Sequence, residues 1–282
     1  MKIKNILVAT DFSNEAYNAL FYASQIFALE PCTFYILNAF DDIVVSAKNV
    51  LFARQKELEK LEINSKENLA KTVHKIVLDT NNSKHNFKTI SSKDSLLNII
   101  SKTIDNYDID LIVLGNKGRT GAKELFMGSN TIKIANKITK CPILAIPKEI
   151  AFKPINEIAF VTDYKKGCTK TTLAMLLNIA AVTDASIAVL HINEEEIMTP
   201  KQVSNQNLLN ICLLKTPHSY DEIWNYNDKA SVIQDFIVER EISMLAMAYH
   251  RRKFFERFLH EPVIMDLSIY ATIPFLILPV QD

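Results

Sequence analysis

Glycine is scarce in this sequence, since only 5 of its 282 residues are glycine. Collagen-like and glycine-rich flexible chains are excluded, because both depend on a high glycine content. Long apolar runs are missing too: the longest, such as Ala271–Val280, are too short to cross a bilayer and contain proline. No signal peptide is visible, because MKIKNILVATDF runs directly into strand-like sequence. We therefore expect a cytoplasmic protein that does not contact membranes.

Metal, disulfide and hydrolase signatures are absent as well. The four cysteines are far apart with no CxxC pair, so we expect free thiols in a reducing compartment. The six histidines show no HExxH or HxH spacing, and no metal site is expected. No GxSxG elbow or catalytic Cys–His signature occurs. Basic and acidic residues balance at 32 each, which excludes electrostatic capture of nucleic acid.

Three short blocks occur twice in the same order. They are NILVATD (5–11) with EIAFVTD (157–163), DIDLIVLG (108–115) with EISMLAMA (241–248), and CPILAIP (141–147) with IPFLILP (273–279). Such self-similarity indicates duplication of one domain. We expect two tandem domains, 1–149 and 150–282.

Within each half, continuous apolar runs alternate with helical stretches. The clearest runs are Ile6–Ala9, Phe34–Leu37, Leu111–Leu114 and Ile143–Ile146. The helical stretches are Ala16–Leu29, 47–73 and Leu96–Asn106, whereas 193–230 in the second half is more irregular. Strands buried on both faces are typical of parallel sheets. The pattern predicts an α/β fold of two doubly wound, Rossmann-like, five-stranded parallel-sheet domains related by a pseudo-twofold, with ligands beyond the carboxyl ends of the strands.

Four of the five glycines lie within residues 115–128, directly after the strand-like DLIVL and before a helix-like TIKIANKITK. A strand, a glycine loop and a helix amino terminus together can direct backbone N–H groups at an anion. Glycine suits such a loop because a Cβ would block close approach. The segment has neither the Walker spacing GxxxxGK[ST] nor the dinucleotide fingerprint GxGxxG. It reads instead Gly115-x2-Gly118-x9-Gly128-Ser129.

On these residues the whole chain resembles the universal stress protein family, as a tandem protein. ATP-binding members carry G-x2-G-x9-G-[ST] after the fourth strand and an aspartate after the first, which here is Asp11. The cofactor implied is ATP, with or without Mg²⁺. Two positions depart from the family: Ala39 is smaller than the usual apolar residue, and Lys117 replaces a frequent histidine. The smaller Ala39 predicts a weaker adenine contact.

The resemblance implies a role for each matching residue. Asp11 would contact the adenosine, Ala9 and Thr10 would line the adenine side, and Ala39 would touch adenine. Gly115 and Gly118 would shape the bend at the ribose and phosphates, and Gly128, Ser129, Asn130 and Thr131 would present N–H and hydroxyl groups to the phosphates. From the residues of the loop, and not from the resemblance, we expect Arg119 to add a positive charge there. Read from the residues alone, Asp11 could equally cap the helix that begins near Ser13 or Asn14.

The second half has lost the loop. Ala248, Arg251 and Phe254 align with Gly115, Gly118 and Gly121, while Glu261 and Pro262 align with Gly128 and Ser129. A carboxylate would repel phosphate and proline removes an N–H donor, so one nucleotide per chain is expected. The basic, aromatic stretch 251–259 allows a membrane or partner surface, but packing in place of the ligand is favoured.

Three functional hypotheses remain open. The leading one is an ATP-binding stress-response or signalling protein with at most slow, adventitious hydrolysis, because no water-activating base or arginine finger is identifiable. The second is a nucleotide-independent adapter that docks partners through the second half. An adenylating enzyme or pyrophosphatase lacks its SGGxDS or HIGH and KMSKS motifs here.

The final strands of both halves are apolar and bracketed by proline. An exposed edge of this kind favours pairing with another strand. We expect Ile143–Ile146 to lie beside Phe275–Leu278 as an intramolecular pseudo-dimer, which leaves homo-oligomers through other surfaces open and identifies no protein partner.

Overall fold

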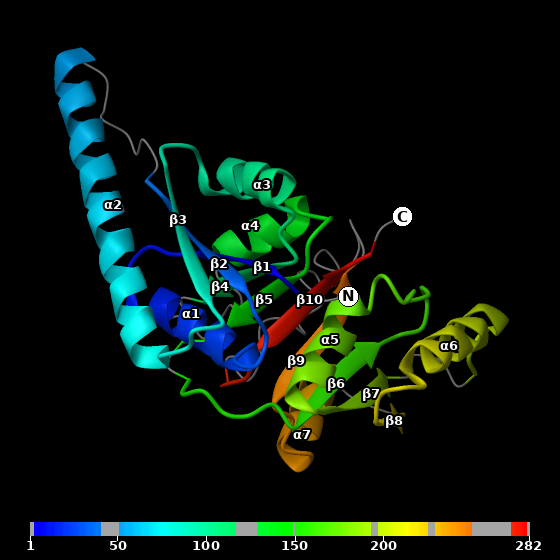
Figure 1. Ribbon diagram of the computed structural model, residues 1–282. Helices are drawn as coiled ribbons and strands as arrows, with labels where there is room; N and C mark the ends of the chain where they lie inside the picture. Colours follow the sequence, from blue (N-terminus) through cyan, green and yellow to red (C-terminus); the bar gives the residue numbers. More distant parts are fainter. Residues whose placement is uncertain are drawn as a thin grey trace.

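The structure is a computed structural model that describes residues 3–40, 51–116, 129–148, 150–192, 197–224, 229–249 and 272–280, with the backbone alone for 51–56, 129, 230 and 249. Strands and helices alternate along the described chain (Figure 1). The first half contains β1 (Asn5–Ala9), α1 (Asn14–Ile26), β2 (Thr33–Ala39), α2 (Leu51–Thr80), β3 (Asn86–Ser92), α3 (Leu96–Tyr107), β4 (Leu111–Gly115), α4 (Ser129–Lys137) and β5 (Ile143–Ile146). The second contains β6 (Glu157–Thr162), α5 (Ala174–Thr183), β7 (Ser186–Ile192), α6 (Pro200–Leu213), β8 (His218–Ile223), α7 (Lys229–Glu239), β9 (Met244–Tyr249) and β10 (Phe275–Pro279).

The strands form one ten-stranded sheet in the order β3-β2-β1-β4-β5-β10-β9-β6-β7-β8. All neighbours are parallel except β5 and β10, which are antiparallel and place Leu144 opposite Leu276. The order on one side of this joint mirrors the order on the other. The predicted fold class and the predicted pairing of the two final strands are confirmed.

Apolar side chains alternate between the two faces of the sheet, and each face has its own core. Ile6 and Val8 of β1 lie in the core beneath α1, α2, α5 and α6, whereas Leu7 lies in the core beneath α3, α4 and α7. Both cores continue across the β5–β10 joint, because Leu276 belongs to the first and Ile277 to the second. Burial on both faces explains why these strands read as continuous apolar runs.

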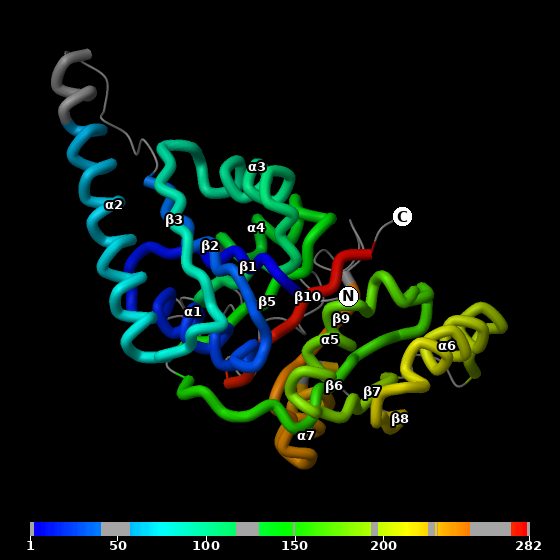
Figure 2. Tube along the Cα trace, viewed as in Figure 1, coloured from blue at the N-terminus to red at the C-terminus, as the bar shows by residue number. Residues whose placement is uncertain are grey.

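Two helical regions differ from the sequence-based expectation. α2 spans 30 residues and ends at Thr80 rather than near residue 73, and Figures 1 and 2 show it lying along the outer side of the first half. The span 193–230, expected to be irregular, contains α6 and β8. The sequence of α6 has one charge and no regular apolar spacing, which concealed the helix, although Thr199 and Gln202 form a capping box at its start.

The same left-handed backbone positions recur in both halves. Phe12 and Tyr164, each just after the first strand of its half, have φ of 65° and 52°. Asp108 and Glu241, each just before the fourth strand, have φ of 48° and 51°. The similarity of the two halves therefore extends to their backbone turns. In the described part of the chain, no helix has the length and hydropathy needed to span a bilayer.

Candidate functional site at the carboxyl edge of the first half

The carboxyl ends of β1 and β4 lie side by side, with Ala9 opposite Leu114. β2 flanks β1 on its other side, with Ala9 opposite Leu37. The crossover connections reverse direction between β1 and β4, so this is the topological switch point at which doubly wound sheets bind ligands. The predicted residues Ala9, Thr10 and Asp11 follow one strand, Gly115 ends its neighbour and Ala39 ends β2.

A chain of buried and partly buried polar groups holds the end of β1. The Thr10 N–H donates to the Leu37 carbonyl at 2.8 Å, and the Asn38 amide donates to the Thr10 carbonyl at 2.7 Å. The Ser65 hydroxyl on α2 donates to Asn38 Oδ1 at 2.8 Å, and the Ser91 hydroxyl donates to Ser65 at 2.7 Å. Buried polar groups of this kind need partners, and the full set fixes the backbone at Thr10.

Asp11 takes part in the start of α1 without being its cap residue. Its carboxylate accepts the Ser13 N–H at 3.0 Å and the Ser13 hydroxyl. Ser13 is the N-cap, because its hydroxyl accepts the Ala16 N–H at 3.3 Å. Asp11 remains exposed at the carboxyl edge. Its contact with the cap residue Ser13 and its predicted contact with a ligand are therefore compatible in position.

Gly115 is required by packing. A Cβ on this residue would lie 2.7 Å from the Glu15 carbonyl oxygen and 3.0 Å from the Ala16 Cα. These are backbone atoms of the first turn of α1, which cannot move aside as a flexible side chain can. Gly115 therefore lets α1 approach β4 directly, a role that the sequence analysis did not foresee.

The start of α4 is tied to the end of β4. Asn116 is buried, its N–H donates to the Ile146 carbonyl at 2.8 Å, and its Oδ1 accepts the Thr131 hydroxyl at 3.3 Å. The Thr131 hydroxyl, predicted to face phosphate, is thus engaged within the protein, whereas Asn130 beside it is exposed. Ser129 begins the helix, where the first-turn N–H groups have no partner within the helix.

Gly118, Arg119 and Gly128 lie outside the described residues, so the predicted glycine loop is placed only by its two ends. Sequence reasoning missed Asn38, Ser65 and Asn116. The available signal was a polar residue inside or directly after an apolar run: FYILNA contains Asn38 and LIVLGN ends in Asn116.

The second half builds the matching edge differently. His191 is buried, its Nδ1 lies 2.9 Å from the Thr162 carbonyl, and its ring packs against Tyr164 with centroids 4.5 Å apart. The Gln202 and Asn205 amides on α6 donate to the carbonyls of Asp163 and Tyr164 at 3.0 and 2.7 Å. α5 begins only at Ala174, 11 residues after Asp163, while α1 begins 3 residues after Asp11.

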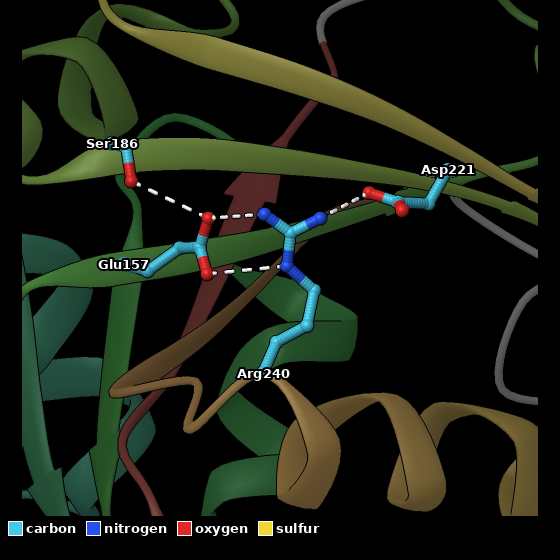
Figure 3. A network of polar contacts seen from close by, with 4 residues as sticks. All are labelled: Glu157, Ser186, Asp221 and Arg240. Atoms are coloured by element: carbon cyan, nitrogen blue, oxygen red, sulfur yellow. Dashed lines mark hydrogen bonds and ion pairs between the residues drawn. The ribbon is translucent and has the colours of Figure 1, made fainter.

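An ion-pair network in the second half lies away from this edge (Figure 3). Arg240 donates to both carboxylate oxygens of Glu157, at 2.8 and 3.3 Å, and to Asp221 at 2.7 Å, while Ser186 donates to Glu157 at 3.4 Å. Glu157 and Ser186 are the first residues of β6 and β7, at the amino edge. Arg240 directly follows α7, so its bidentate pairing with Glu157 and its bond to Asp221 link the end of that helix to β6 and β8.

The cysteines offer no activated nucleophile. All four are free thiols, and burial raises the pKa of both Cys32 and Cys168 to about 12. Burial also raises the pKa of Cys141 and of Cys212. Because the thiolate is the reactive form, the raised pKa values disfavour that form of these thiols near neutral pH. Among the described residues no group of three potential ligands could hold a metal ion.

The fold and the switch-point edge define a doubly wound α/β protein with tandem halves. The universal stress protein family profile matches residues 2–147, more than half of the chain. The chain belongs to the universal stress protein family. No curated protein matches it.

Solved structures support the fold over the full length. A universal stress protein from Archaeoglobus fulgidus DSM 4304 aligns with TM-score 0.71 and 11% identity, covering 97% of this chain and 97% of that chain. The cytoplasmic domain of a prokaryotic cation chloride cotransporter aligns with TM-score 0.57 and 9% identity, covering 98% and 95%. A protein of unknown function from Pseudomonas aeruginosa PAO1 aligns with TM-score 0.56 and 12% identity, covering 98% and 92%. At these identities the likeness concerns the fold alone.

Proposed function

We propose that the first half binds one ATP, with or without Mg²⁺, at the carboxyl edge of β1 and β4. The observation that carries the proposal is position: Asp11, Gly115 and the start of α4 flank the switch point, and the glycine spacing falls between them. Exposed Asp11 would face the adenosine, with Ala9, Thr10 and Ala39 on the adenine side. Gly118, Arg119, Gly128, Ser129 and Asn130 would surround the phosphates, and Thr131 would contribute its backbone N–H.

The second half, in this proposal, binds no nucleotide and serves as a built-in dimer partner for the first. Glu261 and Pro262 stand where the phosphate-binding Gly128 and Ser129 would be. The two units would divide at 1–149 and 150–282. The biological setting we propose is stress response or signalling in the cytoplasm, where free thiols persist, with ATP as a bound ligand rather than a turned-over substrate.

The test is calorimetric titration of ATP into the purified protein, preceded by mass spectrometry of any nucleotide released on denaturation. We expect one ATP per chain in the wild type and loss of binding in Gly118→Val, whose branched side chain blocks approach to phosphate. The position-matched control is Arg251→Val in the second half, which should keep wild-type affinity. Unchanged affinity in Gly118→Val, or two equivalent sites per chain, would contradict the proposal. Absence of both retained nucleotide and ATP binding would favour the adapter hypothesis.

A further inference from the structure

The second half brings two of the four cysteines into contact. Cys212 lies in the last turn of α6, and its Sγ is 3.8 Å from the carbonyl oxygen of Cys168, which lies between β6 and α5. Burial first, and then the charge of a Cys212 thiolate, raise the pKa of Cys168. Such a charge effect requires the two thiols to be close together, because it weakens with distance. The fold therefore places side by side two thiols that are 44 residues apart in the sequence.

The segment that carries Cys168 packs directly against α6. A Cβ on Gly167 would lie 2.9 Å from Asn205 Oδ1 and 3.3 Å from Leu208 Cδ2. Asn205, Leu208 and Cys212 are spaced i, i+3 and i+7, so they share one face of the helix. Gly167 is the one glycine outside the predicted phosphate loop, and its missing side chain lets the backbone approach this face. The next residue, Cys168, is thereby held against Cys212.

The two thiols differ in their access to solvent. Cys168 is 4% exposed, whereas Cys212 is only partly buried. Burial raises the pKa of Cys212, but the positive charge of Lys170 opposes that rise. An oxidant from solvent therefore reaches Cys212 first, and Cys168 is the shielded thiol beside it.

We propose that Cys168 and Cys212 form a reversible disulfide when the protein meets a hydroperoxide. The Cys212 sulfur attacks the peroxide: an S–O bond forms, the O–O bond breaks, and the departing oxygen takes the thiol proton, which leaves a sulfenic acid and an alcohol, or water from hydrogen peroxide. The Cys168 sulfur then attacks the Cys212 sulfur: the S–S bond forms, the S–O bond breaks, and the released hydroxide takes the Cys168 proton to give water. Neither thiol is activated, so the reaction is slow and its selectivity comes from proximity.

The disulfide would fasten the carboxyl end of α6 to the segment between β6 and α5. Nearer the start of the helix, the Asn205 amide already holds the Tyr164 carbonyl of that segment at 2.7 Å. A disulfide requires Cα atoms about 4.4–6.8 Å apart, a condition that contact between the Cys212 sulfur and the Cys168 backbone favours. Disulfides in a reducing compartment are usually transient and respond to oxidants. The pair uses no residue of the proposed ATP site.

The experiment treats the full chain with hydrogen peroxide at neutral pH, blocks the remaining thiols by alkylation in denaturant, and maps the unreduced peptides by mass spectrometry. We expect a Cys168–Cys212 cross-link within one chain that dithiothreitol reverses, and a thermal midpoint about 5–10 °C higher in the oxidised protein. Cys32 and Cys141 are internal controls, because each sulfur also contacts a backbone carbonyl, at 3.8 and 3.4 Å. They lie in the cores on opposite faces of the sheet and should remain unlinked.

Single variants separate the roles of the two thiols. Cys168→Ser should leave Cys212 as a sulfenic acid that dimedone traps, whereas Cys212→Ser should leave Cys168 reduced. The double variant Cys32→Ser/Cys141→Ser should keep both the cross-link and the higher midpoint. Circular dichroism shows whether each variant is folded, and the wild-type peptide map tests the proposal without any variant.

Oxidation in urea shows whether the fold selects the pair, since an unfolded chain should give a mixture of cysteine pairings. A native sample without the Cys168–Cys212 peptide would overturn the proposal. The same mixture of pairings in native and unfolded protein would overturn it too, as would a cross-link that joins ¹⁵N-labelled to unlabelled chains. A thermal midpoint that oxidation leaves unchanged or lowers would contradict the fastening of α6.

Discussion

The two halves place different residues at the same structural positions of their carboxyl edges. Asn38 and His191 occupy equivalent places on β2 and β7, and each bonds the carbonyl at the end of the neighbouring strand, Thr10 or Thr162. Asn38 has a second partner in Ser65, whereas His191 Nε2 is buried without a partner among the described residues. The strand-end hydrogen bond has been kept while the surroundings changed. The comparison teaches that the hydrogen bond at the strand end and the side chains around it vary independently.

The starts of the first helices differ in a related way. Gly115 allows α1 to begin directly against β4, while the second half has Ala248 at that position and a helix that begins later. A tight helix start leaves α1 close to the switch point, with Ser13 as its cap. The residue at the end of the fourth strand and the start of the first helix therefore change together.

The largest expected effect follows from exchanging these residues. Gly115→Ala should lower the free energy of unfolding by about 3 kcal/mol, because its Cβ would meet backbone atoms of α1 that cannot yield. Ala248→Gly in the second half should cost only about 0.5–1 kcal/mol, since it adds chain flexibility and removes one methyl group. Urea unfolding of both variants measures the difference. Equal losses of unfolding free energy in the two variants would contradict the expected difference between the starts of α1 and α5.

Removal of the strand-end donor should have the next largest effect. Asn38→Ala leaves the Thr10 carbonyl and the Ser65 hydroxyl without their buried partner, and we expect a loss of about 2 kcal/mol. His191→Asn keeps an amide donor for Thr162 and loses mainly the ring contact with Tyr164, so about 1 kcal/mol is expected. Denaturant midpoints at a single pH compare the two. A larger loss for His191→Asn would show that ring packing, not the shared hydrogen bond, dominates.

The hydrogen bonds from α6 to the backbone between β6 and α5 provide a smaller test. Asn205→Ala removes the bond to the Tyr164 carbonyl and should cost about 1 kcal/mol. Asn68→Ala on α2, the helix of the first half that corresponds to α6, should change stability by less than about 0.5 kcal/mol. Thermal unfolding monitored by circular dichroism distinguishes them. Similar losses would mean that α2 is held to α1 as tightly as α6 is held to the β6–α5 turn.

The smallest effect concerns pH. Burial lowers the pKa of His85 by more than the bond to the Phe27 carbonyl raises it, and the charge of Lys84 adds a smaller lowering. The folded state therefore binds this proton less readily than the unfolded state. The stability that neutral His85 contributes is fully present above about pH 6.5 and is lost as the pH falls below that value. Replacement by a neutral residue, His85→Gln, should reduce the decline of the free energy of unfolding between about pH 7 and 5, measured by urea unfolding, by less than about 1 kcal/mol. The second half has Thr216 at this position, so Thr216→Gln should leave the pH profile unchanged. A profile that is identical in wild type and His85→Gln would contradict the expectation.

The fold could be predicted from the sequence because its signals are local. Apolar runs such as Ile6–Ala9 indicate strands buried on both faces, and the repeated blocks predict the mirrored strand order of the two halves. α6 escaped prediction, because its asparagines and glutamines give no apolar periodicity and its stability comes from Leu209, Leu213 and the amide bridges. At the candidate site, the positions of Asp11 and Gly115 could be predicted because both residues lie at the carboxyl ends of predicted strands. The packing need for Gly115 and the partners of Asn38 did not, because both depend on residues distant in sequence.

The antiparallel pairing of β5 with β10 also determines when the edge of β5 is covered during synthesis of the chain. Ile146 ends β5, but its neighbour begins at Phe275, about 130 residues later. At a synthesis rate of roughly 5–20 residues per second, the apolar edge of β5 waits about 7–26 s on the ribosome for its partner strand. During that interval the nascent first half presents an unpaired strand edge that invites pairing with other chains. Folding of the first half without aggregation therefore depends on how quickly the second half follows it out of the ribosome.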